Sequence, residues 1–515
     1  MSDAKGKKTD RPSGKKIAAP KGTRDAYPDD VLRRRYVTQA WRDASIRCGF
    51  EEIEGPTFEQ ADLYAVKSGD GILSELFQAF SGKSPEELEQ VQQTGKAPYA
   101  LRPEFTPTLA RMYAARAKQL PQPCKWFTAG PYFRAEKPQR GRLREFLQWN
   151  VDVVGLAGGE SQNAEAQRAE MDAEVVGAIG SLFEQIGFSS QDARFHINNR
   201  NWIRDLLKKF NVRDDEHEQA ISLLDLRSRL SQTAREATVA NEWRGSVEFA
   251  NYYTRQSKKR KQVLEVESPQ EIGMNDGDNR RVLSGAVNLF EALDDYKLVD
   301  WSEIDFDIVR GLAYYTGTVF EVIADGERAV AGGGRYDNLI ELFGGPPTPA
   351  CGFGMGDVVL SNLLDDKGLF PEGPELMEAV SRAPASVRPE AFVIHNGSDE
   401  ARAQVRPLVA ALRRGVEAEG FDGKPWSADR YAAGSNGVRP MHARQSYKAT
   451  GNPGKLWSDA KKQHARFVIE IGEGGAATLK SVDRNETIVG GMDGAWSVDP
   501  ASENFVGRAL MTVLA

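Results

Sequence analysis

Two segments of strand-like composition enclose a strongly basic loop, and this unit constrains the fold more than any other part of the chain. Trp126–Phe133 and Gln148–Gly155 are rich in aromatic and β-branched residues, whereas Arg134–Arg144 between them is mostly polar. Strand-forming residues on both sides of a polar connection are typical of a hairpin. We therefore expect an antiparallel pair of strands joined by a long polar loop.

The loop between these strands carries enough positive charge to bind a phosphorylated ligand. Its charged side chains are five cations and one anion: Arg134, Lys137, Arg140, Arg142 and Arg144, with Glu136. Guanidinium groups match phosphate oxygens with paired hydrogen bonds, so a basic loop can fold over a polyphosphate. The alternative is a charged hairpin tip, although such tips usually mix both signs of charge.

The strand that leaves the loop has one polar and one apolar face. Side chains two residues apart point to the same side of a strand, so Gln148 and Asp152 share a face. Trp149, Val151 and Val153 occupy the opposite face. The alternative is a solvent-facing polar stripe, but the apolar face indicates a buried strand whose polar side serves a ligand.

A second cationic segment, Val309–Val322, reads VRGLAYYTGTVFEV. Arg310 lies between an apolar run and a pair of tyrosines, and Gly311 and Gly317 on either side permit tight turns. A fixed cation beside two aromatic hydroxyls suits a small polar ligand with a carboxylate. A strand hairpin with a surface arginine is the alternative.

Two further segments add polar or glycine-rich positions. Glu104 and Thr106, in LRPEFTPTLAR, are expected on the same side of an extended chain. Ala331–Asp337, AGGGRYD, has three consecutive glycines, which allow close approach of a ligand or a neighbouring strand. Its spacing matches neither the dinucleotide fingerprint nor the phosphate-binding P-loop.

Composition narrows the class of protein. A chain of 515 residues is expected to form several domains, and its net charge of −7 argues against a surface that is basic overall. Cys48, Cys124 and Cys351 are far apart and fit a reducing, cytoplasmic environment. The five histidines have no metal-ligand spacing, so no protein-bound metal is predicted. We expect no signal peptide and no membrane span.

Six segments, in this order, resemble histidyl-tRNA synthetases. They are KGTRDAYPDD (Lys21–Asp30), LRPEFTPTLAR, FRAEKPQRGRLREFLQWNVDVVG, INNR (Ile197–Arg200), VRGLAYYTGTVFEV and AGGGRYDNLIELFGG. The resemblance is strong over about 21–360 and weaker beyond. It implies the class II synthetase fold, an α+β fold whose antiparallel sheet is flanked by helices. Glu54–Tyr64 resembles motif 1, which builds the interface of a homodimer around a proline, here Pro56.

The resemblance and the composition together divide the chain. We expect a disordered basic tail over 1–20, the first part of the catalytic domain over 21–200 and a helical insertion over 201–300. The second part of the catalytic domain follows over 301–370, a linker over 371–390, and a C-terminal α/β domain of the anticodon-binding type over 391–515. The stretch Gly434–Gly454 reads as irregular, and Cys351–Gly356 reads as the start of a helix over Asp357–Leu364.

The resemblance also implies roles for individual residues. Arg134 and Arg310 would be the catalytic cations, with Arg134 on the ATP α-phosphate and Arg310 beside the reacting carboxylate. Glu136 and Arg142 would orient ATP, and Lys137 and Gln139 would contact the tRNA. The expected histidine pocket comprises Glu104, Thr106, Gln148, Asp152, Tyr315 and Tyr336. ATP and Mg²⁺ would be required, and the partners would be histidine, its tRNA and a second subunit.

The sequence departs from the family pattern at three places. Ala313 replaces an acid common in the family near Arg310, and Val359 stands where motif 3 usually has an arginine. Additional residues near 422–457 mean that no anticodon-contacting residues are assigned. These departures leave open which groups orient Arg310 and contact the ATP γ-phosphate.

The sequence therefore predicts a histidine–tRNA ligase. The alternative is a related regulatory subunit of ATP phosphoribosyltransferase, which binds histidine without charging tRNA and usually lacks the C-terminal domain. This chain has that domain and a complete basic loop, and both features favour the enzyme.

Overall fold

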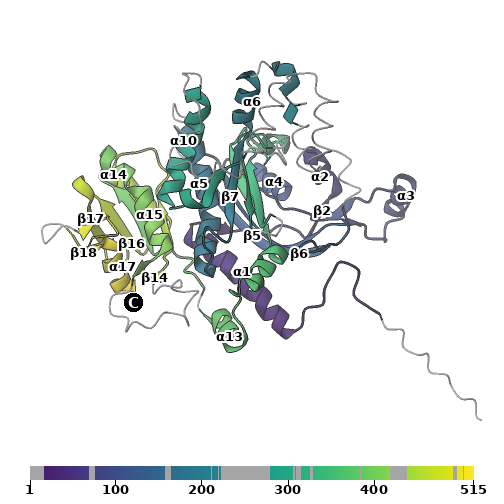
Figure 1. The fold of residues 1–515 in the computed structure, drawn as a ribbon, viewed down its shortest axis with the longest axis horizontal. Coiled ribbons are helices and arrows are strands. Elements are labelled where there is room, and N and C mark those ends of the chain that lie inside the picture. Colours follow the sequence, from purple (N-terminus) through teal and green to yellow (C-terminus); the bar gives the residue numbers. More distant parts are fainter. Residues whose placement is uncertain are drawn as a thin grey trace, which may run out of the picture.

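The computed structural model describes most of the chain in thirteen stretches, and the fold is reported for these alone. They are 17–68, 76–156, 164–209, 212–217, 220–221, 279–305, 308, 315–324, 329–382, 384–417, 438–490, 496–502 and 504–514. Residues 1–16 of the predicted tail and the basic run 258–261 lie outside them. Figure 1 shows a main sheet with helices around it and a second, smaller α/β unit beside it.

An eight-stranded sheet forms the centre of the larger unit. The strands β5 and β6 pair antiparallel from Cys124↔Val154 to Phe133↔Glu145, which confirms the predicted hairpin. All other neighbours are antiparallel except β1 with β5 and β7 with β8. In sheet order the strands are β1 (Glu51–Glu52), β5 (Cys124–Phe133), β6 (Glu145–Val154), β11 (Ala350–Gly356), β10 (Ala331–Arg335), β9 (Thr318–Ile323), β7 (Arg194–Asn199) and β8 (Ser302–Ile304).

Helices cover the apolar face of this sheet. Trp149 on β6 stacks on Trp41 with ring centroids 6.3 Å apart, and its indole nitrogen donates to Ser45 Oγ over 2.8 Å. Because these aromatic groups are fully buried, they hold the first helix against the sheet. The helices in contact here are α1 (Pro28–Arg47), α5 (Ala164–Ile186), α10 (Asn279–Asp295) and α12 (Asp357–Asp366).

A smaller sheet and four helices lie toward the polar side. The sheet has the order β2, β4, β3 and pairs Phe58 with Leu101 and Gln78 with Ala100. Figure 1 shows α3 at the edge of the molecule. The elements are β2 (Phe58–Gln60), α2 (Ala61–Ser68), β3 (Gln78–Ala79), α3 (Pro85–Thr94), β4 (Tyr99–Leu101), α4 (Thr106–Arg116) and α11 (Leu339–Leu342).

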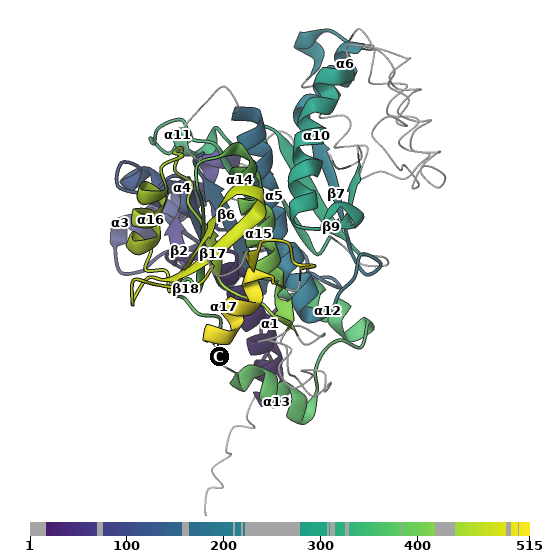
Figure 2. The same ribbon diagram turned by 90° about the vertical axis from the view of Figure 1, so that its left-hand side faces the viewer.

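The described part of the predicted helical insertion is helical. It comprises α6 (Arg200–Lys209), the short 3-10 turn η2 (Asp214–Glu216) and α10, with the 3-10 turn η4 (Val299–Trp301) after it. Figure 2 shows α6 and the start of α10 extending beyond the end of the sheet. Among the described residues, no helix combines the length and the apolar character needed to cross a membrane.

The smaller unit is the predicted C-terminal α/β domain. A six-stranded sheet runs β15, β12, β16, β17, β18, with β19 also on β17, and β13 pairs separately with β14. Its strands are β12 (Ala391–His395), β13 (Val416–Glu417), β14 (Val438–Arg439), β15 (Ala443–Gln445), β16 (Phe467–Ile471), β17 (Ala476–Ser481), β18 (Glu486–Val489) and β19 (Trp496–Ser497). Its helices are α14 (Asp399–Ala403), α15 (Val405–Arg414), α16 (Pro453–Lys462) and α17 (Val506–Leu514), with the 3-10 turn η6 (Glu473–Gly475).

Three local expectations differ from the structure. The sequence Cys351–Gly356 belongs to the central strand β11, because paired neighbours on both sides override the poor strand propensity of glycine. The predicted linker 371–390 contains a helix, α13 (Gly373–Ser381), which packs on α1. The stretch expected to be irregular includes β15, which pairs with β12.

A buried ion cluster joins the two units. Glu174 on α5 is bonded to Lys125 on β5, lies 3.3 Å from the Arg413 guanidinium, and accepts from the Tyr447 hydroxyl over 2.8 Å. Burial alone would raise the pKa of Glu174, but the two cations and the hydrogen bonds lower it to about 2. Arg413 and Tyr447 belong to the C-terminal domain, so these bonds link it to α5 and β5.

Candidate active site

The polar face of β6 and the glycines of β11 form the floor of the candidate site. Gly352 pairs with Asp152, and a Cβ built at Gly352 would lie 2.0 Å from Asp152 Oδ1. A Cβ at Gly354 would lie 2.2 Å from the amide nitrogen of Gln148. The two polar side chains therefore lie across the neighbouring strand, in space that only glycine leaves open.

The glycine run on β10 continues this floor. Gly334 pairs with Gly352, and a Cβ there would lie 3.0 Å from the Tyr315 ring. Burial raises the pKa of the Tyr315 hydroxyl, and the negative charges of Glu104 and Asp152 raise it further. The Tyr315 hydroxyl is therefore near enough to both acids for their charge to affect it.

Tyr336 closes one side of the floor. Its hydroxyl donates to Asp152 Oδ1, and its ring is buried among the residues around α4 and α11. The next residue, Asp337, accepts from the backbone nitrogen of Ala350 over 3.1 Å. Tyr336 is therefore fixed at both its side chain and the adjoining backbone.

The prediction for the Glu104–Thr106 backbone was wrong. Thr106 is the first residue of α4, and Phe105 before it has helical dihedrals of φ −104° and ψ −24°. Pro107 in the first turn favours a helix start, because its fixed φ is helical and it needs no donor there. Glu104 precedes the bend and Thr106 follows it, so the two do not share one side of an extended chain.

Asn150 was missed as a site residue. Its side-chain oxygen accepts from Gln148 Nε2 over 2.8 Å, and both side chains are buried on the same face of β6. This bond directs the other end of the Gln148 amide, Oε1, away from Asn150. Among the described residues, buried Gln148 Oε1 has no hydrogen-bond partner. The shared face of residues 148, 150 and 152 could have identified Asn150 from the alternation alone.

The basic loop is a narrow hairpin with a structured tip. The backbone of Gln139 and that of Arg142 exchange hydrogen bonds of 3.1 and 2.9 Å, and the Arg142 guanidinium pairs with Glu136. Lys137 and Gln139 are exposed at this tip. At the base, Arg134 Nε donates to the carbonyl of Pro103 over 3.2 Å. The predicted phosphate-binding residues thus begin directly beside the Glu104 segment.

The N-terminal segment braces the base of this loop. The backbone nitrogen of Arg144 donates to the Gly22 carbonyl over 2.7 Å. Gly22 has φ +88°, and a Cβ there would lie 2.6 Å from Pro138 Cγ. Both the backbone conformation and the lack of space therefore favour glycine at this position. Arg24, two residues later, pairs with the buried carboxylate of Asp357 at the start of α12.

Two residues of special interest, Arg310 and Ala313, lie outside the described residues. Val359, at the position of the motif 3 arginine, is buried in α12 and packs in the main core. A valine at this place fits a position that faces the core instead of a ligand.

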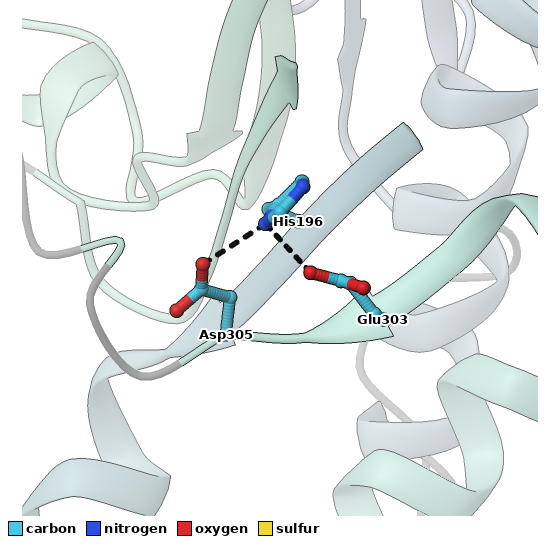
Figure 3. A group of neighbouring side chains, drawn as sticks. All are labelled: His196, Glu303 and Asp305. Atoms are coloured by element: carbon cyan, nitrogen blue, oxygen red, sulfur yellow. Dashed lines mark hydrogen bonds and ion pairs between the residues drawn. The ribbon is translucent and has the colours of Figure 1, made fainter. Parts of the chain in front are cut away.

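The structure also brings together three groups that local spacing does not connect. His196 Nδ1 on β7 lies 2.9 Å from Asp305 Oδ2 and 2.9 Å from Glu303 Oε1 (Figure 3). Ligand atoms of these three residues lie within 4.8 Å of one another, which is a spacing that could hold a metal ion. Hydrogen bonding between the imidazole and the carboxylates accounts for the same arrangement.

The antiparallel sheet with its flanking helices is the fold of a class II aminoacyl-tRNA synthetase catalytic domain. A family model described as histidyl-tRNA synthetase matches residues 22–357. The chain therefore belongs to the histidyl-tRNA synthetase family.

Several similar proteins carry the corresponding name. A histidine–tRNA ligase of Arabidopsis thaliana, named chloroplastic/mitochondrial, is 33% identical over 69% of this chain and 68% of its own length. The histidine–tRNA ligase of Opitutus terrae is 34% identical over 68% and 75%. That of Thermococcus kodakarensis is 32% identical over 77% and 82%.

Solved structures show the same fold. A histidyl-tRNA synthetase from Nostoc sp. PCC 7120 matches with a TM-score of 0.50 and 21% identity, over 92% of this chain and 97% of that one. A Bacillus halodurans protein titled ATP phosphoribosyltransferase regulatory subunit/histidyl-tRNA synthetase has a TM-score of 0.52 and 19% identity, over 88% and 98%.

Proposed function

We propose that this chain activates histidine with ATP, giving histidyl-adenylate and pyrophosphate, and then transfers histidine to the 3′ end of its tRNA. One observation carries the proposal: a cluster of polar side chains lies over the glycines of β10 and β11, beside a basic loop whose cations match phosphate groups. The pocket would take the amino acid, and the loop would take ATP. Membership of the histidyl-tRNA synthetase family supports the choice of histidine.

The pocket has groups for both ends of histidine. Gln148 Oε1, a buried acceptor without a partner among the described residues, can accept from the ligand's α-ammonium group. The neutral imidazole has one donor and one acceptor, which carboxylates and hydroxyls can satisfy. The groups proposed for the imidazole and the rest of the ligand are Glu104, Thr106, Asp152, Tyr315 and Tyr336. An amino acid without a matching ring would leave buried polar groups unpaired, and so would be rejected.

The first reaction needs positioned charge and no base. A histidine carboxylate oxygen forms a bond to the α-phosphorus of ATP, the bond from that phosphorus to the bridging oxygen breaks, and pyrophosphate leaves. Negative charge gathers on the phosphorus oxygens in the transition state. Arg134 and Arg310 are proposed to stabilise it from two sides, with Glu136 and Arg142 orienting ATP. ATP is expected to enter as its magnesium complex, so Mg²⁺ arrives as part of the substrate.

In the second reaction, the 3′-terminal ribose hydroxyl of the tRNA attacks the acyl carbon and AMP leaves. Lys137 and Gln139 are proposed to contact the tRNA near its acceptor end, because both are exposed at the tip of the loop. Lysine and glutamine can each hydrogen-bond to base edges. The C-terminal domain would approach the anticodon.

A homodimer and a cytoplasmic location are parts of the same proposal. Phe58, in the segment that resembles motif 1, is 58% exposed, and its ring packs against Tyr99 in a T-shaped arrangement. Large exposed aromatics are typical of protein interfaces. The three buried free thiols fit a reducing compartment. Sedimentation of the pure protein would distinguish a dimer from a monomer.

Pyrophosphate exchange into ATP tests the activation step directly. We expect exchange with histidine and none with other amino acids. Histidine binding without any exchange would instead favour a regulatory subunit. An Arg310→Ala variant should lose most of the exchange while it keeps the parental melting temperature, and global unfolding of that variant would give Arg310 a structural role.

A further inference from the structure

The INNR segment, Ile197–Arg200, lies at the end of β7 and has no role in the reaction as described so far. It resembles the family pattern, yet none of its residues belongs to the predicted pocket. Three side chains at alternate positions here, His196, Asn198 and Arg200, reach the chain that leads into and out of the Arg310 segment. Their contacts give this part of the sheet a function in positioning.

The first two contacts hold the chain before the Arg310 segment. His196 Nδ1 lies 2.9 Å from Asp305 Oδ2, an interaction drawn as a dashed line in Figure 3. Asn198 Nδ2 donates to the Ile308 carbonyl over 3.0 Å. Asn198 is fully buried, so its amide would be costly to bury without such a partner. Asp305 is fixed further, because its backbone nitrogen donates to the Ile197 carbonyl over 2.8 Å.

The third contact holds the chain after that segment. A guanidinium nitrogen of Arg200 donates to the Tyr315 carbonyl over 3.1 Å, and the Arg200 backbone nitrogen donates to the Gly317 carbonyl over 3.0 Å. Arg200 is itself buried. Tyr315 is the residue whose ring lies over the glycine floor at Gly334. Arg200 thus holds the backbone of a pocket residue without reaching into the pocket.

We propose that Asn198 and Arg200 are positioning residues for histidine binding, which act by holding the backbone at Ile308 and Tyr315. This inference rests on the proposed function, because it concerns the same ligand. His196 and Asn198 share one face of β7, and Arg200 follows as the first residue of α6. These three side chains can therefore hold successive points of the chain on either side of the Arg310 segment. A displacement of about 1 Å at Tyr315 would be enough to weaken the pocket strongly.

The test compares histidine binding with ATP binding in the full-length protein by titration calorimetry. Arg200→Met keeps most of the side-chain volume and the backbone bond to Gly317 but removes the guanidinium. Asn198→Asp keeps the shape and the bond that Oδ1 accepts from the Asn199 nitrogen, but removes the donor. We expect each variant to weaken histidine binding about tenfold, the size of a lost charged or buried hydrogen bond, and to leave ATP binding unchanged.

Two further variants separate positioning from general stability. Arg200→Lys restores one donor and should recover part of the histidine affinity. Arg194→Met removes a guanidinium from the same strand, where it lies 3.6 Å from Glu303, and should bind histidine as the parent does. If Arg200→Met does not fold, Asn198→Asp and Arg200→Lys carry the comparison.

Parental histidine affinity in both Arg200→Met and Asn198→Asp would overturn the inference. Equal losses of histidine and ATP affinity would also overturn it, because they would indicate a structural role. If the parent binds histidine but catalyses no exchange, the proposed ligase function fails while this comparison still decides the role of the two residues. If the parent binds no histidine, both proposals fail together.

Discussion

The carboxylate of Asp152 occupies the space that any side chain at Gly352 would fill. The ideal Cβ position at Gly352 lies 2.0 Å from Asp152 Oδ1, far inside contact distance. The carboxylate is also held by the Tyr336 hydroxyl. The bond to Tyr336 and the absence of a side chain at Gly352 therefore both contribute to its position.

A Gly352→Ala variant should lose histidine activation. The methyl group would force the Asp152 carboxylate from its place, and a displacement of this size costs on the order of 100-fold in rate. Histidine-dependent pyrophosphate exchange measures the loss. Gly356→Ala is the matched control on the same strand, since no atom lies within 4 Å of its Cβ position. Similar activity in the two variants would show that Asp152 does not need its observed position.

An Asn150→Ala variant should bind histidine more weakly. Without its acceptor, the Gln148 amide is free to rotate, and loss of one neutral hydrogen bond of about 1 kcal/mol corresponds to roughly a fivefold change. The KM for histidine in the exchange reaction should rise while the KM for ATP stays constant. Asn150→Asp retains an acceptor for Gln148 Nε2 and should keep the amide in place. A change confined to the KM for ATP would contradict this role.

An Arg134→Ala variant should slow adenylate formation by roughly 100-fold or more, as when one charged transition-state contact is removed. The rate of a single turnover, with ATP and histidine both saturating, isolates this step. Arg140→Ala offers a control in the same loop, because the Arg140 side chain is mostly exposed and its 3.4 Å ion pair with Asp366 lies at the surface. An equal effect of the two substitutions would mean that loop charge matters and the position of Arg134 does not.

A Glu174→Gln variant should be less stable by about 3–5 kcal/mol, because Lys125 and Arg413 would remain buried without their counter-charge. Its melting temperature should fall well below that of the parent. Glu170→Gln is the control on the same helix: half of the Glu170 side chain is exposed, and its pair with Arg406 is worth at most about 1 kcal/mol.

The stability of the parent and that of the Glu174→Gln variant should respond differently to pH. The pKa of Glu174 is lowered in the folded protein to about 2, below its ordinary value of 4.5. Its stabilisation is therefore complete above about pH 4.5 and is lost as the pH falls toward 2. The gap in melting temperature between the parent and Glu174→Gln should stay constant from neutral pH to about pH 4.5 and narrow on acidification from there toward pH 2. A gap that stays constant below pH 4.5 as well would show that Glu174 does not act through its charge.

Local pattern predicted the β5–β6 hairpin because it is encoded by neighbouring residues. The alternation of Gln148, Trp149 and Asp152 was enough to identify the polar face, and the structure confirms it. In the C-terminal domain, α14 and α15 are two separate helices with Gln404 between them. Pro407 cannot donate to the Ala403 carbonyl, which explains the break, and the second helix ends at Gly415 with φ +121°.

The rest depends on contacts that no local pattern records. Asn198 and Ile308 are 110 residues apart, and the bond between them joins a side chain to a main-chain carbonyl, whose residue type is irrelevant. The glycines of β11 were read as the start of a helix. They leave space for side chains of the neighbouring strand β6, and the sequence does not show which strand lies beside them. The roles of the predicted pocket residues in binding remain predictions.

Helix α5 has a consequence for how the two ends of the molecule are connected. Asp172 on this helix bonds to the Arg335 guanidinium over 2.6 Å, next to Tyr336 in the pocket. Glu174, two residues later, bonds to Arg413 and Tyr447 of the C-terminal domain. One turn of α5 therefore contacts both the strand beside the predicted amino-acid pocket and the domain expected to approach the anticodon. A shift of that turn would therefore displace residues that contact both.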